Sequence, residues 1–164
     1  MHTLLSKDAV DSILILGKEN LLKMVPRDYD RTAGGYKKAF ETNFDWYSIL
    51  MALSECCTNS KRRANKFNWD YNLTLQYLAE LWIDQAGKCK VTGIIMSPSS
   101  GYNEDKNPYK ISVDRIINSQ GYIKGNVRLL THWANNAKST WTESVFADFV
   151  TASSRTLLET ESSK

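Results

Sequence analysis

The sequence has few of the features that place a protein in a membrane or an oxidising compartment. None of its apolar runs approaches the roughly 20 residues that a membrane helix needs. The run at residues 13–16 is too short, and too closely flanked by Asp11 and Lys18, to be a signal-peptide core. We therefore expect a cytoplasmic protein without a membrane partner.

Cysteine is also scarce, with only Cys56, Cys57 and Cys89 in the chain. Three cysteines form no even disulfide framework, and an adjacent pair cannot close a normal disulfide with itself. A structural zinc site needs about four thiolate or imidazole ligands, which the segment around Cys89 does not supply. We expect a reducing compartment, no structural zinc, and Cys89 as a small core residue.

The composition is that of an ordinary globular protein. The chain has 164 residues, of which 42% are hydrophobic and 24% charged, so it is long enough for one domain with its own core. The net charge of +3 is too small to indicate a nucleic-acid partner. Where the charges lie matters more than their sum.

Apolar residues at helical spacing predict most of the local structure. Helices are expected over residues 6–24, 44–64, 72–82, 131–138 and 141–158. Ser6, Thr74 (or Asn72) and Thr142 are their candidate N-caps. Residues 27–38 are charged, contain two glycines and should form a loop. We therefore divide the chain into an N-terminal helical extension and linker at 1–40 and a main domain at 41–160.

A β-hairpin is predicted within this helical framework. Residues 110–117 and 126–130 favour strands, and residues 118–125 supply turn residues, including Gly121 and Gly125. The hairpin leads directly into the helix predicted at 131–138. Upstream, residues 89–96 should form a strand or turn, with Gly93 in a tight turn, and residues 97–107 an exposed loop. The expected fold class is α+β, a mostly helical single domain containing a hairpin-helix motif.

Two oxygen-bearing side chains lie where that motif could hold a divalent cation. Asp114 belongs to the first predicted strand and Asn135 to the helix after the hairpin. Mg²⁺ favours oxygen ligands and usually keeps several waters, so two protein oxygens with substrate phosphate oxygens complete a site. Such a metal stabilises a leaving oxygen during phosphodiester hydrolysis. Both residue types are also common in strands and helices without any metal.

Several segments resemble successive motifs of phage HNH endonucleases. They are GKCKVTG (87–93), SVDRI (112–116), GYIKGNVRLL (121–130) and NNAK (135–138), and some phage members also resemble the stretch at 61–82. The resemblance implies a ββα-metal core at residues 110–140. It also implies a metal-dependent DNA endonuclease that hydrolyses phosphodiester bonds with Mg²⁺ or Mn²⁺. Such an enzyme would be phage-encoded, homing-like and active in the host cytoplasm.

The motifs assign roles residue by residue. The resemblance makes Asp114 and Asn135 the metal ligands. It makes Asn126 the central asparagine that fixes the hairpin loop and Lys138 the usual basic residue, which would handle phosphate charge. Asn126 and Lys138 are expected to be catalytic, together with Arg115. The expected DNA-binding residues are Lys61, Arg62, Arg63, Lys66 and Arg128. For the cluster at 61–66, a solvated helix end is the alternative to phosphate contact.

Two positions depart from the family pattern. Arg115 stands where the general-base histidine normally follows the aspartate, and Thr92 replaces the second cysteine of a zinc-binding pair. Arginine stays protonated and cannot accept a proton from water, so we expect Arg115 to hold a phosphate or stabilise transition-state charge. The base would be a metal-bound hydroxide, bulk water or His132, which could equally be a partly buried helix residue.

The change at Arg115 motivates a rival prediction, a DNA-binding protein that kept the fold and lost catalysis. The tryptophans do not decide between the two. Most of the five should be core anchors, with at most one or two contacting nucleic acid. They are Trp46, Trp69, Trp82, Trp133 and Trp141.

Overall fold

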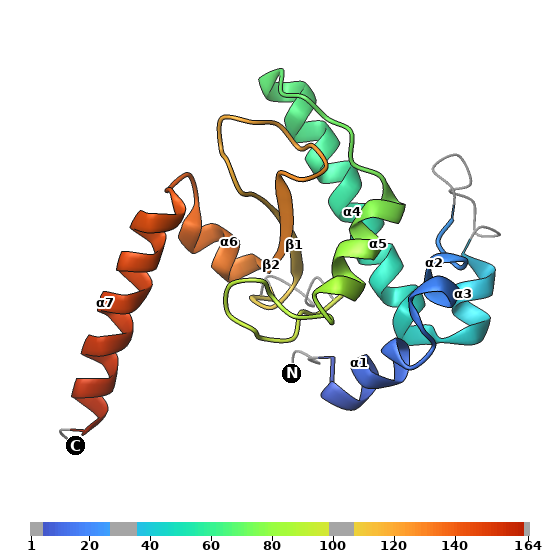
Figure 1. Cartoon of the computed structure of the whole chain (residues 1–164), viewed down its shortest axis with the longest axis horizontal. Coiled ribbons are helices and arrows are strands. Elements are labelled where there is room, and N and C mark those ends of the chain that lie inside the picture. Colours follow the sequence, from blue (N-terminus) through green and yellow to red (C-terminus); the bar gives the residue numbers. More distant parts are fainter. Residues whose placement is uncertain (1–4, 27–35, 99–106, 163–164) are drawn as a thin grey trace.

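The computed structural model describes residues 5–26, 36–98 and 107–162 and is a mostly helical α+β structure (Figure 1). Its elements are α1 (Lys7–Leu14), α2 (Lys18–Leu22), α3 (Lys37–Thr42), α4 (Phe44–Phe67), α5 (Leu75–Asp84), β1 (Ile111–Arg115), β2 (Val127–Thr131), α6 (His132–Lys138) and α7 (Glu143–Ser162). The two strands form one antiparallel sheet. The fold class predicted from the sequence is confirmed at this level.

Helix α4 is the central element, because α1, α3, α5 and β1 all pack against it. Its N-cap Asn43 accepts a hydrogen bond from the Trp46 backbone at 2.9 Å. Its core face consists of apolar residues at helical spacing, and all four are fully buried: Trp46, Ile49, Leu50 and Leu53. The helix continues past residue 64 to Phe67 and ends where Asn68 adopts the left-handed conformation, with φ of 53°.

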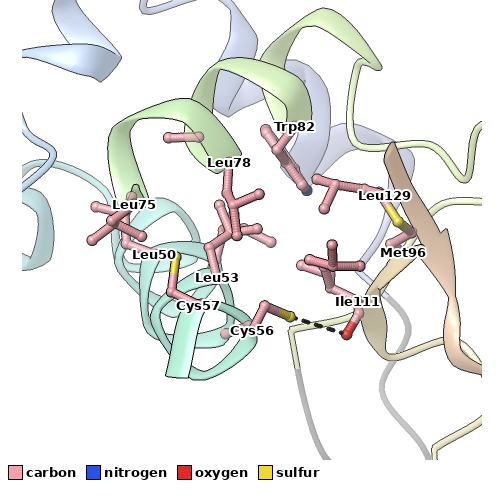
Figure 2. Close-up of a cluster of buried hydrophobic side chains, with 14 of the residues drawn as sticks. Leu50, Leu53, Cys56, Cys57, Leu75, Leu78, Trp82, Met96, Ile111 and Leu129 are labelled. Atoms are coloured by element: carbon pink, nitrogen blue, oxygen red, sulfur yellow. Dashed lines mark hydrogen bonds between the residues drawn. The ribbon is translucent and has the colours of Figure 1, made fainter. Parts of the chain in front are cut away.

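The core lies between α4, α5 and the hairpin (Figure 2). Helix α5, capped by Thr74, contributes Leu78 and Trp82, and both are fully buried. Ile111 and Leu129 enter the same core from the two strands. The Cys56 thiol donates a hydrogen bond to the Ile111 carbonyl at 3.5 Å and so links α4 to β1.

The N-terminal segment differs from the single helix predicted over residues 6–24. Ser6 is the expected N-cap and accepts from the Ala9 backbone at 3.0 Å. However, Gly17 has a φ of 78°, which an α-helix cannot contain, and this residue separates α1 from α2. Val10, Ile13 and Leu21 belong to the same buried core as α4 and α5.

The predicted loop at 27–38 is tested only at its end. Residues 27–35 lie outside the described residues, and α3 already begins at Lys37. The loop predicted at 97–107 is likewise described only at its edges. At these edges the prediction of an exposed loop was wrong, because Ser97 and Asn107 are buried. Ser97 forms a bridge with Lys110 and extends the pairing beside β1.

The hairpin matches the prediction closely. Strands β1 and β2 pair antiparallel, with Asp114 opposite Arg128. Helix α6 follows β2 without a break and packs against both strands. Residues 89–96 form turns with a single antiparallel bridge, Lys88 to Ile95. These elements place the end of α4, β1 and α6 around one surface of the protein.

Helix α7 extends away from the rest of the structure (Figure 1). Thr142 accepts from the Val145 backbone at 3.4 Å, in agreement with its predicted capping role. Phe146 is the one buried side chain of α7 within residues 143–159. None of the described helices is long and apolar enough to cross a membrane.

Candidate active-site groove

Two adjoining pockets lie between the C-terminal half of α4, β1 and α6, with volumes of about 390 Å³ and 260 Å³. We call the pair the hairpin groove, the first the wide pocket and the second the narrow pocket. They share lining residues from all three elements. These are Arg63, Val113, Tyr122, Asn135 and Asn136.

Asp114 lies in the narrow pocket as a buried carboxylate with two cationic partners. Its side chain is 3% exposed. One carboxylate oxygen accepts from Arg128 Nε at 2.9 Å and the other from Lys138 Nζ at 3.1 Å. Lys138, the last residue of α6, is fully buried and also donates to the Arg115 carbonyl at 3.1 Å. A buried ion group of this kind depends on every charge being present.

Arg128 joins this group to α7. Its guanidinium donates to both carboxylate oxygens of Glu143, at 2.9 Å and 2.6 Å. Burial disfavours the charged guanidinium, but the hydrogen bonds and charges of Glu143 and Asp114 outweigh burial and raise the pKa of Arg128. Arg128 was expected to bind a DNA phosphate. Its guanidinium instead contacts two carboxylates, and the residue lines neither pocket of the groove.

Asn135 lines both pockets, and Asp114 shares the narrow one with it. The Asn135 amide nitrogen donates to Ser112 Oγ at 2.8 Å and to the Val113 carbonyl at 3.1 Å. Within the part of the chain that the structure describes, its Oδ1 accepts no hydrogen bond. The structure thus brings together the two residues predicted as metal ligands and leaves an amide oxygen available.

Arg115 holds the hairpin loop. Its Nη1 donates to the carbonyls of Asn118 and Gln120 at 2.7 Å and 3.2 Å. The guanidinium also lies over the Trp69 ring, 3.6 Å from the centroid. The two hydrogen bonds use two of the five N–H donors of the guanidinium. Arg115 was expected to meet a phosphate, and it does line the narrow pocket.

Asn126 acts on the same loop from inside. It is 4% exposed. Its Oδ1 accepts from the Ile117 backbone at 2.9 Å, and its Nδ2 donates to the carbonyls of Ile117 and Gly121 at 3.1 Å and 3.0 Å. Asn126 lines neither pocket of the groove, so its place in the structure is that of a loop-fixing residue.

The basic cluster at the end of α4 divides between surfaces. Arg62 and Arg63 line the wide pocket, and Arg63 also lines the narrow one. Lys61 and Arg62 line a separate pocket. Lys66 instead lies over the Phe67 ring, 5.3 Å from its centroid.

His132 is half-buried and lines the wide pocket. Its Nε2 is 3.0 Å from the Asn136 amide nitrogen. It is the only imidazole within residues 5–26, 36–98 and 107–162. The wide pocket also contains the ion pair of Lys110 with Glu55 at 2.8 Å, which the sequence did not indicate.

Cys89 is 2% exposed and belongs to the core, as predicted. Burial favours its neutral thiol, but hydrogen bonds from Thr92, Thr131 and Val91 outweigh burial and lower the pKa of Cys89. The Thr131 hydroxyl donates to its sulfur at 3.7 Å. Thr92 and Thr131 thus both form hydrogen bonds with this sulfur. No cluster of three or more His, Cys, Asp or Glu side chains occurs among the described residues.

Comparisons with protein-family models, curated proteins and solved structures found no match for this chain. The likeness to HNH endonucleases stays a prediction from the sequence.

The sequence did not single out Phe67, Trp69 or Glu143 as parts of the site. The role of Glu143 could not be predicted from the sequence, because it depends on where α7 begins relative to Arg128. Phe67 and Trp69 carried a signal, since aromatic residues directly after a Lys/Arg cluster are typical of nucleic-acid surfaces.

Proposed function

We propose that this chain is a metal-dependent DNA endonuclease. The observation that carries the proposal is the shared narrow pocket of Asp114 and Asn135, bordered by Arg63. A carboxylate and an amide oxygen are donors that Mg²⁺ or Mn²⁺ accepts, with water and phosphate oxygens in the other positions. The bound metal would polarise the phosphodiester and stabilise the leaving oxygen.

The existing partners of Asp114 do not exclude that role. A carboxylate has about four lone-pair sites, and Arg128 and Lys138 use one on each oxygen. Because both cations also hold the carboxylate in place, its orientation is fixed before a metal binds. Asn135 is fixed similarly through its amide nitrogen.

The other residues of the groove provide for the substrate. Arg62 and Arg63 supply positive charge for DNA phosphates along the wide pocket. Arg115 and Asn126 keep the hairpin loop in shape beside the narrow pocket. His132 lines the wide pocket and carries the side-chain type that most often serves as a general base.

The buried ion group favours a second candidate, the DNA-binding protein without catalysis. Asp114 already has its charge balanced by two cations, and a metal would add a third positive centre to the same carboxylate. A surface that only binds phosphates would need the arginines of α4 and no metal.

Plasmid nicking decides between them. Wild type, Asn135→Ala and Asn20→Ala should be incubated with supercoiled DNA in Mg²⁺, Mn²⁺ or EDTA. Asn20 is the matched control, because it is an exposed residue of α2 that lines neither pocket of the groove, and among the described residues its side chain bonds the Leu16 carbonyl alone. We expect wild type and Asn20→Ala to nick in either metal, and Asn135→Ala to lose about 10- to 100-fold or more of that activity.

Binding to the same DNA should be measured in EDTA by anisotropy. Equal DNA affinity of all three proteins would show that Asn135→Ala loses activity in the cleavage step and not in DNA binding. Binding without any metal-dependent nicking by wild type would establish the catalytically inactive binder. Full activity in Asn135→Ala would move the reaction out of the narrow pocket.

A further inference from the structure

The wall of the narrow pocket contains an aromatic stack that the proposed nuclease chemistry does not use. Phe67 and Trp69 stack with ring centroids 4.8 Å apart and planes 26° apart. The Arg115 guanidinium carbon also lies 3.6 Å from the centroid of the Trp69 ring. The indole ring is therefore in contact with both Phe67 and Arg115. Phe67, in contrast, is 51% exposed at the end of α4, and the group over its ring is the ammonium of the exposed Lys66.

Polar groups complete the pocket. Asn118, Asn136, Ser139 and Thr140 line it together with Phe67 and Trp69. Asn118 is held in place, since its Nδ2 donates to the Thr140 carbonyl at 2.8 Å. An aromatic face bordered by amide and hydroxyl groups matches a nucleobase, which has a flat π-face and a polar edge.

Access to such a face requires a base outside the double helix. Inside a duplex both faces of a base are covered by its neighbours, so an aromatic side chain meets only a base that is unpaired or turned out of the stack. We infer that the narrow pocket binds an unpaired nucleobase of DNA, stacked on Phe67. This rests on the proposed function for its DNA substrate, and it places the unpaired nucleotide beside Asp114 and Asn135.

The charges next to the stack agree with this occupant. Lys66 Nζ lies 5.3 Å from the centroid of the Phe67 ring, and Arg63 lines the same pocket. A nucleotide stacked on Phe67 would displace the exposed Lys66 ammonium from over the ring, and its phosphate would then meet that ammonium and Arg63. The preferred substrate class is then DNA with a bulge, a mismatch or a single-stranded segment rather than fully paired DNA.

The test is equilibrium binding in EDTA, by fluorescence anisotropy, to two short DNA duplexes. One is fully paired, and the other carries a single unpaired adenine. Wild type should bind the bulged duplex about tenfold more tightly, the effect of one stacked base. Phe67→Ala should lose this preference and keep the affinity for paired DNA, whereas Phe67→Trp should retain both.

Phe44→Ala is the matched control, because Phe44 is a 62% exposed phenylalanine at the opposite end of the same helix. It should behave as wild type. Equal affinity of wild type for the two duplexes, binding of neither, or a preference that survives in Phe67→Ala would overturn the inference. Binding is measured without metal, so it does not depend on nuclease activity. Absence of plasmid nicking would therefore contradict the nuclease proposal without affecting the interpretation of the binding result.

Discussion

At the scale of residues, the charge balance around Asp114 determines what can be changed in the groove. Lys138 has no exposed surface, and Asp114 is its carboxylate partner. Arg128 has a second carboxylate in Glu143. Loss of the Asp114 charge therefore leaves Lys138 as an unpaired buried cation, while Arg128 keeps a partner.

The first prediction follows from that asymmetry. Asp114→Asn keeps the size of the side chain, and we expect it to lower the free energy of unfolding by about 3–5 kcal/mol, the cost of breaking a buried ion pair from one side. Urea denaturation followed by circular dichroism measures the change. Loss of nuclease activity in an Asp114 variant would thus partly report unfolding, which is why Asn135 is the better test of chemistry.

The control is the double variant Asp114→Asn with Lys138→Met. Replacing the buried ammonium by an apolar chain of similar length removes the unpaired charge, so the double variant should be more stable than Asp114→Asn alone. If it is equally or less stable, the Asp114–Lys138 interaction does not carry the cost assigned to it here.

At the scale of elements, the hairpin loop is held mainly by side chains rather than by turn geometry. Asn126 makes three hydrogen bonds across it, and Arg115 donates to two more of its carbonyls. Segment 70–72 presses against the loop from outside. A Cβ at Gly121 would lie 2.1 Å from the Asp70 carbonyl oxygen, and the Asn72 backbone donates to the Tyr122 carbonyl at 3.1 Å.

The second prediction concerns Asn126→Ala. The change removes the partner of the buried Gly121 carbonyl and of the part-buried Ile117 amide, while the Ile117 carbonyl keeps its hydrogen bond from the Gln120 backbone. A buried group left without a partner costs about 1–3 kcal/mol. We expect a loss of several kcal/mol in urea denaturation, whereas Asn65→Ala on the exposed end of α4 should be nearly silent. A stable Asn126→Ala protein that lacks nicking activity would contradict the loop-fixing role and make the residue catalytic.

Local patterns in the sequence predicted elements well, and contacts between distant residues escaped them. The core face of α4 and the hairpin leading into α6 follow from spacing and propensity. The break at Gly17 was missed because apolar spacing continues across it. Gly121 was expected to serve a turn, whereas the close approach of Asp70 requires it, as no local rule can show.

The candidate site divides in the same way. The order of hairpin and helix suggested Asp114 and Asn135 as a pair, the motif likeness supported the pairing, and the two residues do line one pocket. The partners of Arg115 and Arg128 could not be predicted, because Trp69 and Glu143 reach them only through tertiary packing. For both arginines, charge alone suggested phosphate contact.

At the scale of the whole molecule, the described contacts that join α7 to the body lie in its first turns. Phe146 is buried, and Glu143 binds Arg128. Beyond them the helix is exposed, with Leu157 and Leu158 at 66% and 61%. The packing that holds the domain together therefore ends within the first turns of α7.

The third prediction is that a protein ending at Val150 is as stable as the full chain. The deletion removes residues 151–164, of which 151–159 are described and bury no side chain, so the free energy of unfolding should change by no more than about 0.5 kcal/mol. The matched contrast is Phe146→Ala in the full chain, which empties a buried site and should cost about 3–5 kcal/mol. Thermal melting at several protein concentrations compares the three. A truncated protein that melts well below the full chain would mean that the exposed apolar side chains of α7 are covered in solution, and a dependence of that loss on concentration would identify the cover as a second copy.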